Sequence, residues 1–454
     1  SNIAQLNNAI ALAQGSGQSP NDLLDQRDQL ITQISQQIGV STVKQSDGSI
    51  SVFTANGQPL VVGATANTLS LVQNSYDPTR MELAIGKPAT NINSQVSGGV
   101  IGGLLSARTQ VLDPTTASLG KIATALAQAV NSQNGQGVDL NGNLGTAIFS
   151  SPTPTVLPAS GNQGGASIST GITDPNQLTG SNYTLRYDGS QWSLVQSGTN
   201  AVVPMSGAGT AASPFTAAGL SFQVSGTPGT GDSYLIEPTQ NAAGQIQMVM
   251  SDPSQIAAAG AVTPKATTGN SGSGTIAFSG VTNSSDPNLF TPVTIQFTSA
   301  NTYSINGSGS YSYTAGSAIS MNGWSVSISG TPASGDSFSV GKTPKNSGDN
   351  SNANLMAALS TRKLLDGGSN SINSANVSLV SKAGTTSQQA TASATAAQSV
   401  LTQTQTQMSS TSGVNLDQEA ADLLRFQNAY QAAAQVISTG QNLFQSLLTA
   451  VRGG

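Results

Sequence analysis

The chain has 454 residues, a formal net charge of −5 and few charged side chains, which make up 8% of the total. Lys and Arg form no cluster, so neither nucleic-acid binding nor polybasic attachment to a membrane is indicated. Because Cys and His are both absent, disulfides, thiolate or imidazole metal sites and His-dependent nucleophiles are excluded. No run of about 20 apolar residues occurs, so we expect no membrane insertion.

The length of the chain predicts at least three domains, since a single core rarely grows past about 250 to 300 residues. The chain begins with Ser1 rather than Met, and no charged-then-apolar leader follows. We therefore expect a fragment that lacks its natural start.

The first predicted helix runs from Pro20 to Ile38, where apolar side chains recur at helical spacing. Gly39 follows as a stop signal. Ser19 is the expected cap, with Pro20 as the first helical residue, because proline is tolerated there.

After this helix the hydrophobic period changes from helical spacing to two. The dipeptides Asp47-Gly48 and Asn56-Gly57 suit tight hairpin turns. We predict a single antiparallel meander that continues to about Ile85, within a small β-hairpin subdomain covering about 40–97.

Helical spacing returns over 103–111, stops at Asp113-Pro114 and resumes as far as Val130. Proline is accepted only in the first turn of a helix. The pattern therefore predicts two helices, the second of them capped by the Asp113 side chain.

Two β domains are predicted, one over 145–243 and one over 274–345, separated by a connector over 244–273. Their composition is rich in Gly, Ser and Thr with short alternating runs. The segments GLSFQVSGTPGTGDSYLIEPT and GWSVSISGTPASGDSFSVGKT match at about half their positions without a gap, about 104 residues apart. This spacing is too long for a solenoid unit, so we interpret the domains as related copies in tandem.

Candidate catalytic and metal-binding residues are few. Asp232 and Asp336 occupy equivalent GDS positions of the two copies, and the interpretation we favour is that each closes a turn. The segment DLNGN at 139–143 resembles a calcium loop but lacks the spaced acidic ligands and the terminal Glu. We predict no enzyme activity, no cofactor and no metal.

Helical structure returns over 346–413, first in NSNANLMAALSTRKLL and then in a long helix from about Ala375 to Met408. The seam of the long helix consists mostly of Ala, Ser and Thr, which permit close approach but bury little area. Ser412-Gly413 interrupts the helix, and Asn415 with Gln418 forms a capping box for the last helix, expected over 414–454.

The last helix has an apolar seam with a seven-residue repeat. Nine of its eleven seam positions are apolar over five heptads, which favours a coiled coil. Gln427 and Gln441, in the same seam, either set the register of pairing or face solvent. The predicted subunit or chaperone interface consists of Leu416, Leu423, Tyr430, Ile437, Phe444, Leu448 and Val451.

Two interpretations of this seam remain open. It packs on the preceding helix as an ordinary hairpin, or it needs a partner from a missing N-terminal segment or another subunit. The small residues of the preceding helix make the hairpin alone an insufficient cover for the seam.

The segment SGVNLDQEAADLLRFQNAYQAAAQVISTGQNLFQSLL resembles the C-terminus of bacterial flagellar axial proteins, most closely the family of hook-associated protein 1, which joins hook to filament. Other stretches agree, including NDLLDQRDQLITQISQQIGVSTVKQSDGSISVFTANGQPLV, GGLLSARTQVLDPTTASLGKIATALAQAVNSQNGQGVDLNGNLGTAIF and SGDNSNANLMAALSTRKLL. Relative to the family, the chain lacks the N-terminal helix and the first part of the helical domain.

The resemblance implies an α+β multidomain fold with a discontinuous helical-bundle domain, a small β-hairpin subdomain and two tandem antiparallel β domains inserted between helical segments. It implies self-assembly into a ring, with the hook protein and the second junction hook-associated protein as neighbours. It further implies type III export to an extracellular flagellum, with an export chaperone bound to the C-terminal helices.

The expected function is therefore that of a structural adaptor between hook and filament. The alternatives are a secreted β-rich protein that binds or hydrolyses carbohydrate through Asp232 and Asp336, and an adhesin that uses the β repeats. The adaptor hypothesis predicts that deletion of residues 415–454 abolishes filament attachment and motility, whereas the adhesin hypothesis predicts that binding survives this deletion.

Overall fold

The computed structural model describes residues 1–16, 20–412 and 416–452. The chain divides into two compact units, residues 1–383 and 384–454. The first unit combines helices with several antiparallel sheets, and the second is helical. The α+β multidomain class that the sequence predicts is confirmed.

Two helices that pack against each other open the first unit, α1 (Asn2–Gly15) and α2 (Asn21–Gln37). Helix α1 was not predicted from the sequence, although Ile3, Asn7 and Ile10 are buried at helical spacing on one face. Asn7 is fully buried and bonds the carbonyl oxygens of Ile50 and Gly63. It thereby fixes α1 to the adjoining sheet.

The helix predicted from Pro20 to Ile38 is confirmed as α2, but its start differs from the expectation. Pro20 is the N-cap residue and not the first helical residue. Ser19, the expected cap, lies outside the described residues.

The strands predicted to form one meander instead form two sheets. The first has the order β1-β2-β3-β4 and the second the order β5-β6-β7. The predicted turns at Gly48 and Gly57 are present, each glycine with a positive φ that only glycine adopts readily. The strands are β1 (Val40–Lys44), β2 (Ile50–Thr54), β3 (Pro59–Val62), β4 (Thr65–Ala66), β5 (Leu69–Gln73), β6 (Met81–Ile85) and β7 (Thr90–Asn91).

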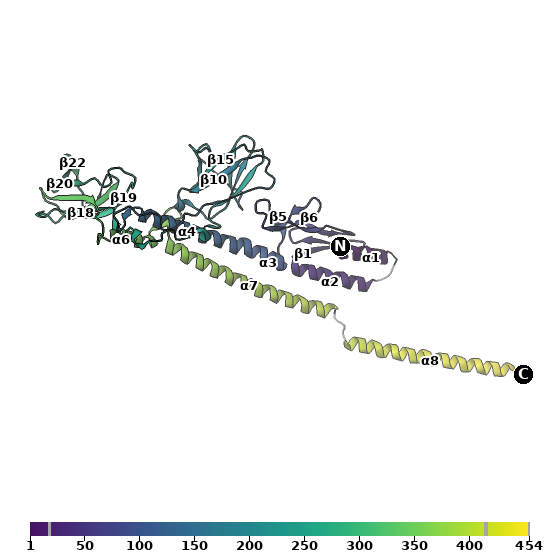
Figure 1. The fold of residues 1–454 in the computed structure, drawn as a ribbon. Helices are drawn as coiled ribbons and strands as arrows, with labels where there is room; N and C mark the ends of the chain where they lie inside the picture. The colour runs from purple at the N-terminus through teal and green to yellow at the C-terminus, as the bar shows by residue number, and fades with distance from the viewer. Residues whose placement is uncertain (17–19, 413–415, 453–454) are drawn as a thin grey trace. The chain divides into compact units, whose positions relative to one another are not determined.

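A long helical rod follows the short 3-10 turn η1 (Asn93–Gln95). It consists of α3 (Gly99–Ala107), a π-helical segment η2 (Arg108–Leu112) and α4 (Asp113–Asn134), which lie in line in Figure 1. The predicted break at Asp113-Pro114 is therefore wrong. The wider π turn ends at Leu112, two residues before Pro114, whose ring would clash with the previous turn of a regular α-helix.

Asp113 does not cap a helix, because its own backbone is helical. Its carboxylate instead faces Arg108 and Arg80, at 3.8 and 4.0 Å. The capping prediction failed because an N-cap residue needs a non-helical backbone, whereas the helix continues without interruption through Asp113.

The first β sandwich packs a five-stranded sheet, of order β13-β12-β11-β16-β9, on a three-stranded sheet, of order β10-β15-β14. Leu185 and Ile236 from one sheet meet Leu220 and Phe222 from the other in one buried core. The strands are β9 (Thr155–Pro158), β10 (Ser167–Ile172), β11 (Tyr183–Tyr187), β12 (Trp192–Gln196), β13 (Val202–Val203), β14 (Phe215–Ala217), β15 (Leu220–Ser225) and β16 (Ser233–Glu237). The 3-10 turn η3 (Pro175–Gln177) links β10 to β11.

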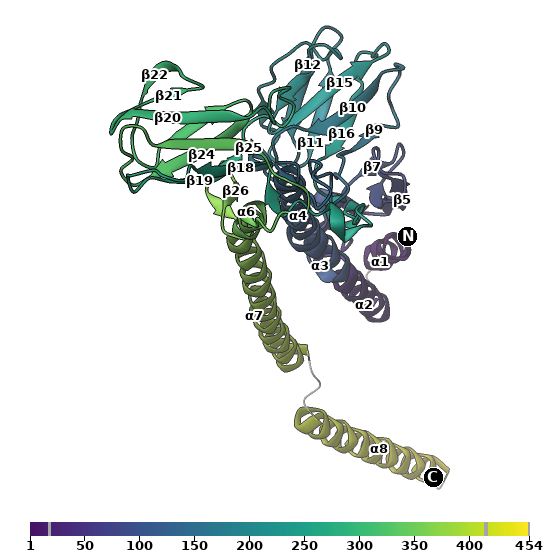
Figure 2. The same cartoon turned by 60° about the vertical axis from the view of Figure 1, so that its left-hand side comes forward.

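The second β sandwich has the same arrangement, with sheets of order β22-β21-β20-β25-β18 and β19-β24-β23. The two sandwiches form separate groups of strands in Figure 2. The strands are β18 (Val262–Ala266), β19 (Thr275–Val281), β20 (Val293–Ser299), β21 (Thr302–Ile305), β22 (Ser308–Ser312), β23 (Ala318–Met321), β24 (Trp324–Ser329) and β25 (Ser337–Lys342). Each strand has a counterpart at the same place in the first sandwich, and β18 falls within the stretch 244–273 that the sequence analysis assigned to the connector.

Short elements join the sandwiches to the rod. The connector contains α5 (Ala242–Gln245) and η4 (Pro253–Gln255). The two-residue strand β17 (Ala259–Gly260) pairs with β8 (Gly137–Val138) at the end of the rod.

After the second sandwich the chain returns through α6 (Ser351–Ala357) and η5 (Ala358–Ser360). The helix predicted for this stretch ends early, because β26 (Lys363–Leu365) pairs with β27 (Asn370–Ser371). The helix α7 (Ile372–Ser412) then begins and confirms the predicted long helix. Its first turns pack on Ile122 and Ala125 of the rod.

Candidate assembly interface

The candidate interface lies on α8 (Leu416–Arg452), in the second unit. The helix contains no proline, and Asp417 and Glu419 lie in its first turn, where negative charge is favourable. Its expected cap, Asn415, lies outside the described residues. A helix with a strict seven-residue repeat over five heptads tends to wind into a left-handed supercoil with its partner.

The large seam side chains of α8 are exposed to solvent. The most exposed is Tyr430, at 78%, and the least is Leu448, at 46%. Leu423, Ile437 and Phe444 lie between these values. The side chains of Leu416 and Val451, which the sequence placed in the same seam, lie outside the described residues.

The apolar surface of α8 is wider than the predicted seam. Five further large side chains are also exposed, namely Leu424, Phe426, Val436, Leu443 and Leu447. From Phe426 onward, most of these residues and the seam residues fall on one broad face at about 100° per residue, opposite a face of Gln, Asn, Ser and Thr. Exposed apolar patches of this kind mark interaction sites.

Gln427 and Gln441 are exposed, as are the apolar seam residues around them. Their exposure therefore does not distinguish a residue that sets register from one that faces solvent. Both interpretations of these glutamines stay open.

The hydroxyl groups of α7 bond within their own helix. Thr404, in the predicted seam, donates to the carbonyl oxygen of Val400 at 2.8 Å, and Thr391, Thr395 and Thr402, beside the seam, also donate to carbonyl oxygens four residues earlier, at 3.0, 3.0 and 2.9 Å. Hydroxyls satisfied within their own helix need no partner outside it. This part of α7 can therefore approach another helix closely.

The two aspartates proposed for carbohydrate chemistry close turns. Asp232 accepts backbone N–H bonds from Gln163, Gly164 and Gly229, at 2.7, 3.1 and 2.8 Å. These donors stabilise the charged form, Gly229 most strongly, and hold the pKa of Asp232 below its ordinary value.

Asp336 has the same environment in the second sandwich. It accepts from Ser271, Gly272 and Ala333, at 2.7, 3.0 and 2.8 Å. The N–H of Ala333 makes the largest contribution to lowering the pKa of Asp336. A carboxylate that is fully occupied by the backbone of its own turn and of a second loop is not available to a substrate.

The segment at 139–143 is likewise a turn, in which the Asp139 carboxylate accepts from the N–H of Asn143 at 2.8 Å. In the described part of the chain, no group of three or more Asp, Glu, Cys or His side chains is placed to hold a metal ion. None of the described helices has the length and apolarity needed to cross a membrane.

Family models match three parts of the chain. The model of the flagellar hook-associated protein FlgK helical domain matches residues 1–149. The model of the flagellar hook-associated protein 1 D2-like domain matches residues 157–238. The model of the flagellar basal body rod FlgEFG protein C-terminal region matches residues 405–450.

Individual relatives agree with these models. Flagellar hook-associated protein 1 of Escherichia coli (strain K12) is 30% identical over 452 residues, which cover 98% of this chain and 68% of the relative. The protein of the same name from Salmonella typhimurium (strain LT2) is 30% identical over 463 residues, with the same coverage. The solved structure of the flagellar hook junction protein FlgK from Burkholderia pseudomallei is 33% identical and has a TM-score of 0.77, covering 91% of this chain and 81% of that one.

Proposed function

This chain belongs to the flagellar hook-associated protein 1 family, and on that premise we propose that it works through subunit contacts made by the apolar face of α8. It is a structural protein of the bacterial flagellum, at the junction between hook and filament. Neither the relatives nor the turn-closing Asp232 and Asp336 support the carbohydrate or adhesin alternatives.

The observation that carries the proposal is the exposed stripe formed by Leu423, Tyr430, Ile437, Phe444 and Leu448. Burying one large apolar side chain contributes about 1.5–3 kcal/mol. Five such side chains therefore represent a gross gain of about 8–15 kcal/mol, which is available only when partner helices cover them. Part of this gain is offset by the ordering of the partners.

We extend the proposal to the partners that the family suggests. Copies of the chain form a ring, with the hook protein on one side and the second junction hook-associated protein on the other. An export chaperone covers α8 before assembly, and export through the flagellar channel places the protein outside the cell. Family membership and the exposed stripe support these partners.

We also propose that different segments of the chain form parts with different roles. Residues 1–144, with the subdomain at about 40–97, and residues 346–413 form the helical body. Residues 145–243 and 274–345 form two β arms joined through 244–273, and 414–454 form the assembly helix. The repeated strand order of the two arms supports this division.

The test places a charge in the stripe of the full-length protein. Leu423→Asp and Ile437→Asp should each abolish incorporation into the junction, because a carboxylate cannot be buried in an apolar seam without a large cost. Swimming in soft agar and filaments counted by electron microscopy measure the loss. Gln435→Asp adds the same charge to the polar face of α8 and should leave both unchanged.

Secretion must be followed in the same strains, because a chaperone contact would also be disturbed. The amount of each variant in the culture medium separates failed export from failed assembly. Normal filaments carrying Leu423→Asp or Ile437→Asp would overturn the interface assignment.

A further inference from the structure

The short hairpin β26–β27, residues 363–371, lies directly before α7 in the chain (Figure 2). Its turn has an unusual backbone, because Asp366, Gly367 and Gly368 have φ values of 56°, 68° and 81°. This left-handed region is unfavourable for a residue with a side chain, and Asp366 keeps it only where surrounding contacts hold it. The shape of the turn therefore depends on the groups that bond it.

The first β sandwich holds this turn through Asn176. The N–H of Gly367 donates to the Asn176 carbonyl oxygen at 2.9 Å, and the N–H of Gly368 donates to the Asn176 side-chain oxygen at 2.8 Å. Asn176 lies in η3 and is itself fixed, since its N–H donates to Asp174 at 3.0 Å. Leu178, two residues later, is buried in the core of the sandwich. The turn is therefore bonded to a segment that is anchored in that core.

The rod also holds the turn, through the carboxylate of Asp366. The Lys121 ammonium group of α4 donates to one carboxylate oxygen at 2.7 Å, and the Asn370 side chain donates to the other at 2.7 Å. The Lys121 side chain is 12% exposed, so solvent screens this pair less than an ordinary surface ion pair. Both carboxylate oxygens of Asp366 are thus occupied, one of them by the rod.

The hairpin packs against the start of α7 as well. Leu365, directly before the turn, is fully buried in a cluster with Ile122 and Ala125 of the rod. The first turns of α7 pack against the same cluster through Ile372, Ala375 and Leu379. A close-packed interior transmits displacement, because a buried side chain cannot shift without its neighbours. A shift of the turn at 366–368 therefore reaches α7 through Leu365.

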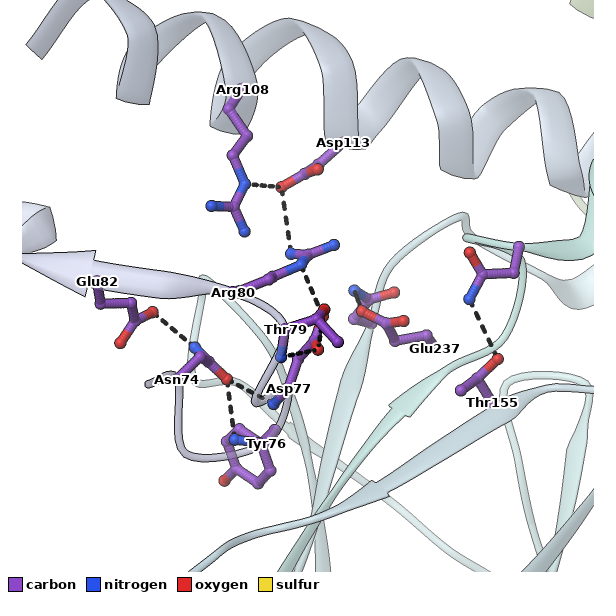
Figure 3. A network of polar contacts seen from close by, with 12 residues as sticks. Asn74, Tyr76, Asp77, Thr79, Arg80, Glu82, Arg108, Asp113, Thr155 and Glu237 are labelled. Carbon is purple, nitrogen blue, oxygen red and sulfur yellow. Dashed lines mark hydrogen bonds and ion pairs between the residues drawn. The ribbon is translucent and has the colours of Figure 1, made fainter. Parts of the chain in front are cut away.

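The first sandwich has two other contacts with the helical body, and both are with residues 74–120. The loop 74–80, part of which is drawn in Figure 3, makes hydrogen bonds of 2.7 and 3.2 Å with Ser160 and Ser233. The carbonyl oxygen of Thr239 lies against Gly120 of the rod, where a Cβ atom would approach it to 1.7 Å. Among the hydrogen bonds of the described residues, those of Asn176 join this sandwich to the segment that leads into α7.

The second sandwich is attached elsewhere. The N–H of Ala257, just before this sandwich, donates to Asn134 at 2.9 Å. Asn352 donates to the carbonyl oxygens of Ala257 and Gln133 at 2.6 and 3.0 Å. In the described part of the chain, no hydrogen bond joins residues 262–342 to the hairpin β26–β27.

We propose that the hairpin β26–β27 is a joint that transmits displacement of the first sandwich to the start of α7, whereas the second sandwich has no such link. The strained turn carries the coupling, because it keeps its shape only while Asn176 and Lys121 hold it. This inference goes beyond the assembly role of α8 and rests only on contacts within residues 1–383.

Hydrogen exchange of single backbone amides in the intact chain tests the joint, because exchange reports the local opening of each helix and turn. The probes are the amides of residues 376–380 in α7, and the Ala257 amide at the base of the second sandwich is the internal reference. Asn176→Ala removes an acceptor of the Gly368 N–H. The amides of 376–380 should then exchange about fivefold faster, as expected for one lost hydrogen bond, while the Ala257 amide should keep its rate.

Gln177→Ala is the matched control. Gln177 is exposed in the same turn as Asn176, and its side chain donates to Asp174 and not to the hairpin, so the exchange of 376–380 should not change. Asp174→Ala removes the carboxylate that fixes Asn176 and should act in the same direction as Asn176→Ala. It takes the place of Asn176→Ala if that variant does not fold.

Unchanged exchange of 376–380 in Asn176→Ala, or in Asp174→Ala where that variant takes its place, would overturn the proposal. An acceleration that is equally large at Ala257 would also overturn it, because the loss would then be general and not transmitted through the hairpin. Neither outcome bears on α8, so a failure here leaves the assembly proposal untouched.

Discussion

The two β sandwiches share one fold and differ in how they are attached. Their strand orders correspond strand for strand, and each closes its GDS turn with a buried aspartate that accepts three backbone N–H bonds. At their bases, however, different residues make the contacts: Asn176 of the first sandwich bonds Gly367 and Gly368, whereas Asn134 and Asn352 bond Ala257, just before the second sandwich. A fold can therefore be copied with its internal pattern while its attachment is set by a few residues outside it.

The two tryptophans allow each sandwich to be followed separately, since Trp192 belongs to the first core and Trp324 to the second. The chain contains only these two. Replacing one with Phe leaves the fluorescence of the other as the probe of its own sandwich.

We expect the largest effects from removing the turn-closing aspartates. Asp232→Ala should destabilise the first sandwich and Asp336→Ala the second, because each leaves three backbone donors unpaired. Urea unfolding followed by the tryptophan of the affected sandwich measures the loss, and the other sandwich is the internal control. Very unequal losses of stability would contradict the equivalence of Asp232 and Asp336.

These aspartates also predict the acid response of both sandwiches. A folded-state pKa below the ordinary value, 3.8, contributes stability that is present above that value and is lost as the pH falls through the folded pKa. Both sandwiches should therefore lose stability below about pH 3.8, and the Ala variants should lack this part of the pH dependence.

The next largest loss of stability is expected at Asn352, whose buried side chain bonds Ala257 and Gln133. Asn352→Ala should cost about 3 kcal/mol, because it leaves buried groups of Gln133 and Ala257 without partners. The free energy of unfolding and the exchange of the Ala257 amide measure it. Asn354→Ala, exposed on the same helix, should change the free energy of unfolding little. An equally small effect at Asn352 would show that its hydrogen bonds do not stabilise the base of the second sandwich.

The close backbone contact between Gly120 and Thr239 predicts a smaller loss of stability at the base of the first sandwich. Gly120→Ala should cost about 2 kcal/mol, because its methyl group must displace the backbone at Thr239. Thermal unfolding with Trp192 as the probe measures this cost. Gly103→Ala, where a methyl group meets nothing within 4 Å, should be neutral or slightly stabilising.

The smallest expected effect is a gain. Because burial raises the pKa of Glu237 above its ordinary value, 4.5, protonated Glu237 is favoured in the folded protein. The stability that this adds is fully present below pH 4.5 and is lost as the pH rises through the folded pKa. Glu237→Gln should therefore stabilise the first sandwich at neutral pH, by about 1 kcal/mol. Unfolding at pH 4 and pH 7 should show the gain at pH 7 only.

Much of the fold could be predicted, because it follows from periodic patterns. The helices α2 and α7, the hairpin glycines Gly48 and Gly57 and the duplication of the β domains each leave a local or repeated signal. The helix α1 was missed although Ile3 and Ile10 carry such a signal, since its buried face is completed by the polar Asn7.

Other features had no signal in the sequence. Asp113 follows the rules for a cap and instead faces two arginines, one of them 33 residues away. The loop at 74–80 reads as an ordinary polar turn, and its contacts with Ser160 and Ser233 depend on how distant elements pack. For the candidate interface, the sequence nominated the α8 residues, and the structure added the exposure of those that it describes.

The sequence by itself determined the chemistry that this protein lacks, the duplication of its arms and the seven-residue stripe of its last helix. Composition and spacing are properties of the chain that survive in any conformation. Only the tertiary structure decided which residues attach each arm to the helical body, because both junctions join residues that are far apart in the chain. Such contacts have no period, and they exist only once the rod has brought their partners together.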